Sequence, residues 1–184
     1  MAKTSTWQSL RGWALLAAVA LAPLLLAQER TGGRANLLKN PSFEDGLEGW
    51  DFSSFDKKGA VKVDEGQARD GTKSAMIENA TADDSFLKQT VAVKPNTLYR
   101  LSGVIRTENV DTKRFGATLS LEGTFETTKS IDRSKSWTRV SFEFSTGPLD
   151  TIKVGCRLGH HSSKASGKAW FDQLELVELR PARK

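Results

Sequence analysis

The stretch that decides the fold is Gly167–Leu176, GKAWFDQLEL, near the C-terminal end of the 184-residue chain. It is a dense apolar run with one acid, Asp172, in its middle. Its counterpart is Asn36–Trp50, NLLKNPSFEDGLEGW, near the other end of the same domain. We expect these two stretches to be the first and last strands of one β-sandwich. They would then be neighbours in space, with Glu44 and Asp172 meeting at the seam between them.

Between these ends, short segments in which apolar and other residues alternate follow one another along the chain. Turn-forming pairs such as Asp70-Gly71, Pro95-Asn96 and Gly147-Pro148 separate some of them. Short strands at this spacing predict an all-β fold, a two-sheet antiparallel β-sandwich or jelly roll. The predicted strands are centred on Ala60–Val63, Ser74–Glu78, Leu87–Val93, Tyr99–Ile105, Leu119–Leu121, Val140–Phe144 and Ile152–Leu158.

The N-terminus has the layout of a secretory signal peptide. Lys3 and Arg11 give it a positive start, an apolar run follows, and Leu25-Leu26-Ala27 offers a cleavage site. We therefore expect a secreted protein, extracellular or periplasmic, that has no membrane attachment after cleavage; a retained anchor is the alternative. The expected segments are a signal peptide (1–27), a polar linker (28–35), the β-sandwich (36–180) and a basic tail (181–184).

The composition argues against several classes of function. The formal net charge is only +5 and charges of both signs are interspersed, which argues against a nucleic-acid partner. The single cysteine, Cys156, permits no internal disulfide, and its alternation with Val154 and Leu158 indicates a buried apolar residue rather than a nucleophile. The sequence has no nucleophile motif, and no two acids are placed for glycoside hydrolysis. We therefore expect no enzymatic activity.

In each predicted strand, the residues that point away from the core include small, polar and charged types; we call these positions the mixed phase. Arg106, Glu122 and Arg157 fall in this mixed phase of three middle strands. Two arginines and a glutamate suit sugar hydroxyls or a uronic carboxylate. They equally suit a solvated sheet face with salt bridges. The adjacent pair His160-His161 is a poor zinc site because neighbouring side chains diverge, and we expect its loop at the rim of the binding face.

Five stretches occur in a recognisable order: NLLKNPSFEDGLEGW, ARDGTKSAMI, LKQTVAVKPNTLYRLSGVIRT, WTRVSFEFST and SGKAWFDQLEL. Together they resemble the jelly-roll carbohydrate-binding modules of families four, nine and twenty-two, which are found beside bacterial glycoside hydrolases and belong to the galactose-binding-like superfamily. The resemblance covers Asn36–Leu179. It implies a β-sandwich that holds an oligosaccharide or polysaccharide on the concave face of one sheet.

The resemblance also implies which residues face the ligand. Arg106, Glu122 and Arg157 would lie on the concave face, and the loop that carries His160, placed at the rim by its composition, would border it. Gln89 stands at a glutamine position of the family, although it shares the phase of its apolar neighbours and a buried hydrogen-bonding role is the alternative.

Aromatic platforms for the sugar are harder to find. We expect Trp50, Trp137 and Trp170 to pack in the core or at its edge. No obvious aromatic residue stands in the mixed phase, which argues against xylan or cellulose as the ligand.

A structural calcium ion between the first and last strands is a further implication of the resemblance. Its ligands would be the carboxylates of Glu44 and Asp172, with main-chain carbonyls near Ser42 and Lys73. Calcium takes six to eight oxygen ligands of these kinds. In the alternative, Glu44 caps a turn and Asp172 makes a structural hydrogen bond.

The sequence therefore predicts a secreted, non-catalytic module that binds a polysaccharide or oligosaccharide. It would tether a separate glycoside hydrolase or a cell-surface protein to that glycan. The alternative is a structural or adhesion domain whose concave face meets protein or no ligand. Asn79-Ala-Thr81 also matches an acceptor for N-glycosylation.

Overall fold

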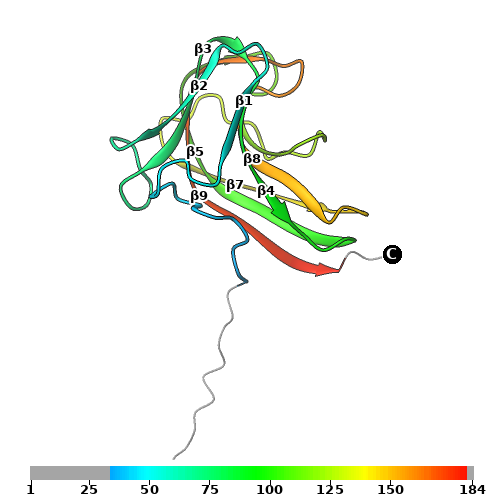
Figure 1. The fold of residues 1–184 in the computed structure, drawn as a ribbon. Helices are drawn as coiled ribbons and strands as arrows, with labels where there is room; N and C mark the ends of the chain where they lie inside the picture. Colours follow the sequence, from blue (N-terminus) through cyan, green and yellow to red (C-terminus); the bar gives the residue numbers. More distant parts are fainter. Residues whose placement is uncertain (1–33, 182–184) are drawn as a thin grey trace, which may run out of the picture. The chain divides into compact units, whose positions relative to one another are not determined.

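Strand β9 (Ala165–Pro181) lies at the centre of the larger of two sheets. The structure is a computed structural model that describes residues 34–181. The five-stranded sheet has the order β2-β3-β9-β5-β7, and a four-stranded sheet, β1-β4-β8-β6, forms the second layer (Figure 1). The predicted two-sheet antiparallel β-sandwich is confirmed. The other strands are β1 (Asp51–Ser54), β2 (Gly59–Asp64), β3 (Ser74–Asp83), β4 (Ser85–Ala92), β5 (Thr97–Thr112), β6 (Ala117–Leu121), β7 (Thr138–Ser145) and β8 (Thr151–Leu158).

A β-bulge in β9 explains how its dense apolar run is used. Phe171 and Leu174 both point into the core, with 0% and 2% of their surface exposed, although strict alternation would place them on opposite faces. Gln173 lies between them with a φ of 50°, and the pairing of β9 with β5 shifts register at this point. The extra residue changes the inward phase. Both halves of the strand therefore bury apolar side chains between the two sheets.

The prediction of a first strand at residues 36–50 is wrong, but the prediction that this segment lies beside the last strand is correct. Residues 36–50 form turns beside β9, and the backbone N–H of Leu37 donates to the carbonyl of Leu176 over 2.9 Å. A cluster of left-handed backbone conformations, which prevents a regular run of extended residues, explains the difference. They occur at Asn40, Phe43, Gly46 and Gly49.

The core confirms the predicted roles of the cysteine and of two tryptophans. Cys156 is fully buried, and burial raises the pKa of its thiol well above the usual value, so the thiol is unsuited to act as a nucleophile. Trp50 and Trp170 are buried as well, whereas Trp137 is partly buried. None of these three rings is an open platform for a sugar.

Some predictions fall on other parts of the chain. The expected signal peptide and most of the linker and tail lie outside the described residues. In residues 34–181, no helix has the length and apolar character needed to cross a bilayer.

The possible glycosylation acceptor, Asn79, is fully buried. Its side-chain nitrogen donates to the carbonyl of Ala165 over 2.9 Å, and its oxygen accepts from the Ser85 hydroxyl over 2.6 Å. The amide therefore serves the interior of the sandwich and is not accessible for modification.

Candidate functional site

The outer face of the four-stranded sheet has a pocket of about 270 Å³. Its floor comes from the mixed phase of the strands, because the register places Phe86 of β4 directly opposite Arg157 of β8. Phe86 is only 5% exposed because Arg157 covers it, with the guanidinium carbon 5.1 Å from the ring centre. The lining residues are Ser53, Ser54, Phe55, Asp84, Phe86, Glu122, Gly123, Arg157 and His161.

A buried ion pair holds the guanidinium of this floor in place. Nε and one terminal nitrogen of Arg157 donate to the two carboxylate oxygens of Asp84 over 2.7 and 2.6 Å. Both residues are 7% exposed. This two-bond geometry fixes the plane of the guanidinium and leaves its other N–H groups free to donate elsewhere.

Glu122 closes the pocket at another point and is also paired. Its carboxylate bonds to the ammonium of Lys88 and lies 3.2 Å from that of Lys153. Burial opposes the ionisation of Glu122, but these two ammonium groups outweigh it and lower its pKa. Each cationic side chain of this group therefore has a carboxylate partner.

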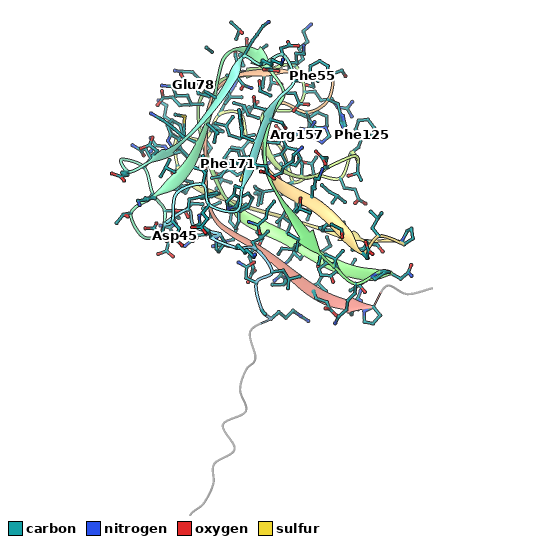
Figure 2. The ribbon with its side chains drawn as sticks, viewed as in Figure 1. Asp45, Phe55, Glu78, Phe125, Arg157 and Phe171 are labelled. Atoms are coloured by element: carbon teal, nitrogen blue, oxygen red, sulfur yellow. The ribbon has the colours of Figure 1, made fainter. Side chains whose placement is uncertain are left out.

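Two exposed phenylalanines stand at opposite edges of the sheet. Phe55 directly follows β1, one edge strand, and is 76% exposed. Phe125 follows β6, the other edge strand, and is 77% exposed. Figure 2 shows both rings in the same region of the molecule as Arg157. Phe55 lines the pocket, and Phe125 stands beside it, against the pocket-lining His161. Large exposed aromatic side chains at a pocket are typical of ligand sites.

The loop after β8 supports the Phe125 side of this arrangement. The ring of His161 lies 4.7 Å from the ring of Phe125, and its Nε2 is 3.1 Å from the carbonyl oxygen of Thr124. His160, which was predicted at the rim, is instead only 1% exposed and packs between Phe115 and Phe125. The structure therefore places His161 at the pocket, with His160 behind it.

We expect His160 to make the stability of the domain sensitive to mild acid. Burial, helped by the nearby charge of Arg157, lowers the pKa of His160 from 6.5 to about 4. The unfolded chain then takes up this proton at a higher pH than the folded chain. The stabilisation is complete above pH 6.5 and is lost as the pH falls towards 4, by up to about 3 kcal/mol.

Urea unfolding at pH 7 and at pH 4.5 measures this effect. His160→Leu should flatten the pH dependence, whereas His161→Leu, at an exposed ring whose charge contributes less to the shift than burial does, should keep most of it. An unchanged dependence in His160→Leu would contradict the assignment.

Arg106 was predicted beside Glu122 and Arg157, but it lies on the other sheet. It belongs to β5, and its guanidinium carbon is 5.5 Å from the ring centre of Trp170. Arg106 lines a separate pocket of about 460 Å³, together with Asp132 and Arg133. The structure thus brings Glu122 and Arg157 together and leaves Arg106 outside the group.

The side chain of Gln89 lies on the core side of β4, as the alternative interpretation, a buried hydrogen-bonding role, predicted. It is 4% exposed, accepts from the backbone N–H of Lys39 over 2.8 Å and donates to the carbonyl of the same residue over 3.0 Å. In this structure its amide links the N-terminal segment to the sheet.

Glu44 and Asp172, which were predicted to meet at the seam, both hold the loop that precedes β3. Asp172 is fully buried and accepts the N–H groups of Arg69 and Asp70 over 2.7 and 2.9 Å. Glu44 accepts the N–H groups of Thr72 and Lys73. Burial raises the pKa of Asp172, although these N–H donors oppose the shift.

One contact at the seam bears on the predicted calcium ion. The ammonium of Lys73 donates to the main-chain carbonyl of Glu44 over 3.0 Å, so a cation already lies against a backbone oxygen here. The oxygens present are carboxylates and carbonyls, which fit calcium in kind. Among residues 34–181, no three His, Cys, Asp or Glu side chains form a metal-binding group, so carbonyls such as that of Ser42 would have to complete the shell.

Sequence reasoning missed the aromatic side chains of this face. Phe86 stands in the mixed phase of β4, opposite in phase to Leu87, so the expectation of no aromatic residue there is wrong. Phe55 and Phe125 lie in polar loops, SSFDKK and GTFETT. A lone aromatic residue in such a loop is the signal that would have identified them.

Comparisons with known proteins bear on the family and the fold of the domain. Residues 35–158 match the family described as Carbohydrate binding domain (CBM_4_9). The chain is 29% identical over 158 residues to the tRNA(Glu)-specific nuclease WapA of Bacillus subtilis subsp. natto, a match that covers 77% of this chain and 7% of that protein. It is 28% identical over 143 residues to Exochitinase 1 of Streptomyces olivaceoviridis, covering 78% of this chain and 22% of that protein. The chain thus spans a small part of these larger relatives.

Solved structures share the fold. TmCBM61 in complex with beta-1,4-galactotriose superposes with a TM-score of 0.57 at 22% identity, covering 79% of this chain and 99% of that one. The CBM22-1 xylan-binding domain of Paenibacillus barcinonensis Xyn10C gives a TM-score of 0.58 at 16% identity, covering 82% and 98%. With the family match over residues 35–158, the chain belongs to the carbohydrate-binding domain family CBM_4_9.

Proposed function

We propose that the chain is a secreted, non-catalytic module that binds a neutral polysaccharide or oligosaccharide across the outer face of its four-stranded sheet. The observation that carries this proposal is the pair of exposed rings, Phe55 and Phe125, at the two edges of the sheet that holds Arg157. Aromatic rings pack against the apolar faces of sugars, and a few polar groups between them fix the orientation. Free N–H groups of Arg157 would donate to sugar hydroxyls.

The pairing of Arg157 supports a neutral ligand at the floor of the pocket. Asp84 neutralises Arg157, whereas Lys88 and Lys153 share the single carboxylate of Glu122 and leave one positive charge at the edge of the site. A uronic carboxylate over Arg157 would have to displace Asp84 or lie beside it, which is unfavourable in a partly buried site. Neutral hydroxyls meet no such penalty.

A glycan array that contains neutral and acidic polysaccharides tests the proposal. We expect the full chain to be retained by at least one neutral glycan. Exclusive retention by acidic glycans would contradict the neutral assignment, and retention by none would contradict the function. In the cell, the module would tether a separate glycoside hydrolase or a cell-surface protein to the glycan.

We also propose a calcium ion at the seam, held by the carboxylates of Glu44 and Asp172 and by nearby carbonyls. A ligand that binds only the folded state raises the melting temperature. Added calcium should therefore raise it, and a chelator should lower it. Glu44→Ala should remove the calcium effect, and Glu78→Ala, a control that pairs with Lys168 on the outer face of the five-stranded sheet, should retain it. A melting temperature that does not change when the chelator is added would contradict the proposed calcium site.

A further inference from the structure

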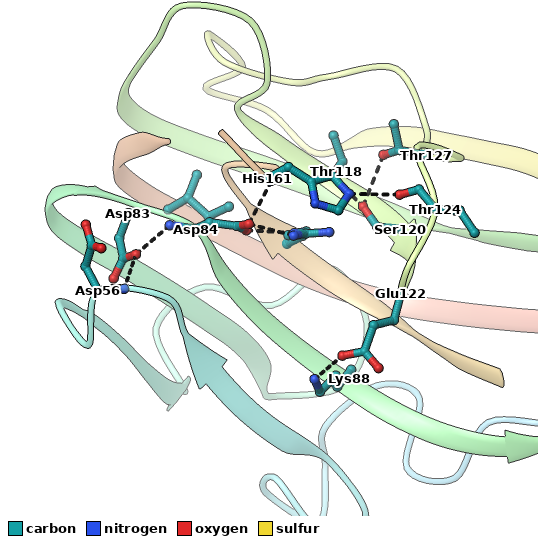
Figure 3. A network of polar contacts seen from close by, with 12 residues as sticks. Asp56, Asp83, Asp84, Lys88, Thr118, Ser120, Glu122, Thr124, Thr127 and His161 are labelled. Atoms are coloured by element: carbon teal, nitrogen blue, oxygen red, sulfur yellow. Dashed lines mark hydrogen bonds and ion pairs between the residues drawn. The ribbon is translucent and has the colours of Figure 1, made fainter. Parts of the chain in front are cut away.

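The dipeptide Asp83-Asp84 connects β3 to β4 and reaches both sides of the pocket. Asp83 is the last residue of β3, and β4 begins immediately after Asp84. The two side chains point in different directions, one towards Asp56 and the other towards His161 (Figure 3). Asp83 is fully buried and Asp84 is 7% exposed. Burying two adjacent carboxylates is unfavourable unless each is well bonded, so their partners indicate their role.

Asp83 fixes the turn that carries Phe55. Its carboxylate accepts the Ser54 hydroxyl and the backbone N–H groups of Asp56 and Lys58, the latter two over 2.9 and 3.0 Å. The backbone N–H of Phe55 donates to the carbonyl of Asp84 over 3.0 Å. The Phe55 ring is mostly exposed, so the backbone of its turn sets where the ring stands.

The protonation state of Asp83 agrees with this anchoring. Burial opposes its ionisation, but the hydrogen bonds from Ser54, Asp56, Lys58 and the N–H of Asp84 outweigh burial and lower its pKa from 3.8 to about 2. The anchor therefore stays charged throughout the neutral and mildly acidic range.

Asp84 fixes the floor and the opposite wall. Besides its two bonds to Arg157, it accepts the backbone N–H of His161 over 2.7 Å. His161 in turn lies against the ring of Phe125 and beside the Thr124 carbonyl. Asp84 thus holds the turn that supports one side of the Phe125 ring, while the loop of Phe125 is itself closed by a hydrogen bond from the N–H of Leu121 to the carbonyl of Glu126.

We infer that Asp83 and Asp84 are positioning residues for glycan binding, each acting through one wall of the pocket. Asp83 acts through Phe55, and Asp84 acts through Arg157 and the His161–Phe125 contact. This inference rests on the proposed function, since it assigns roles within the same site. Neither carboxylate needs to touch the glycan.

A double-mutant cycle on the full chain, with the neutral glycan retained on the array as the probe, tests this coupling. Asp83→Asn should weaken binding about tenfold in the wild-type and Phe55→Ala should weaken it similarly. In the Phe55→Ala background, Asp83→Asn should have less than a twofold effect. In the Phe125→Ala background it should keep its tenfold effect. Asp84→Asn should keep its effect in the Phe55→Ala background.

Asp64→Asn is the matched control, because Asp64 also bonds a neighbouring N–H but lies on the other sheet. It should leave the affinity unchanged. An undiminished effect of Asp83→Asn in the Phe55→Ala background would overturn the inference. If Asp83→Asn does not fold, Ser54→Ala, which removes one of the bonds, replaces it in the same cycle.

Hydrogen exchange followed by mass spectrometry separates this inference from the proposed function. Without glycan, Asp83→Asn should speed exchange in residues 54–59, and Asp84→Asn should speed it in residues 159–163. Unchanged exchange in these segments would overturn the positioning roles. A wild-type chain that binds no glycan would instead overturn the proposed function, and exchange would still decide whether the carboxylates hold the two turns.

Discussion

Arg157→Ala should lower the free energy of unfolding by about 3–5 kcal/mol, because it leaves the buried carboxylate of Asp84 without its partner. The same variant should lose glycan binding, since the floor of the pocket loses its only guanidinium. Chemical denaturation at neutral pH and binding to the retained glycan measure the two effects.

Two further variants make this prediction specific. The double variant Asp84→Asn/Arg157→Met removes both charges and should recover much of the stability but not the binding. Lys153→Ala breaks a largely exposed pair and should change stability by less than about 1 kcal/mol. If Arg157→Ala is as stable as Lys153→Ala, the ion pair does not hold the floor as described.

Phe55→Ala and Phe125→Ala should each weaken glycan binding at least tenfold and leave the melting temperature almost unchanged. The two rings are 76% and 77% exposed, so their loss removes little buried apolar surface from the folded domain. In binding sites, aromatic anchors of this kind commonly contribute 2 kcal/mol or more. Isothermal titration with the retained glycan measures the loss.

Leu149→Ala is the control for these variants, because Leu149 is another large exposed apolar residue, at 51%. It lies in the turn between β7 and β8 and lines a neighbouring pocket beside Glu122, so it tests whether any exposed apolar residue near the sheet matters or only the two rings. It should bind as the wild type does. Equal losses in all three variants would mean that general exposure of apolar surface, rather than the two walls, controls binding.

Much of the sandwich could be predicted because alternation is a local property of each strand. The apolar phase of Ile152–Leu158 correctly placed Cys156 in the core. Alternation does not report bulges or left-handed turns. It therefore missed the phase change at Gln173 and predicted a strand across residues 36–50, where turns run beside β9 instead.

The site was predictable in part for the same reason. The phase of a strand tells which residues point away from the core, but a sandwich has two outer faces. Glu122, Arg157 and Arg106 were all correctly taken out of the core, and only the topology shows that Arg106 belongs to the other sheet. The sheet to which a strand belongs is decided by its pairing with strands far apart in the sequence, and a single sequence does not reveal that pairing.

The exposed rings beside the pocket could not be found from the alternation of residues along the strands. Phe55 and Phe125 stand in loops, where no repeat marks the direction of a side chain. The buried anchors Asp83 and Asp84 look like an ordinary polar turn in the sequence. Their importance emerges only from the hydrogen bonds they accept from segments on both sides of the pocket.

The central claim is that the glycan lies across the outer face of the four-stranded sheet. Hydrogen exchange of the full chain, with and without saturating neutral glycan, tests it most directly. The account predicts slower exchange in residues 53–58, 84–88, 122–127 and 155–161, and no change in residues 98–106 and 138–145. Protection confined to the last two segments, which belong to the five-stranded sheet, would contradict it.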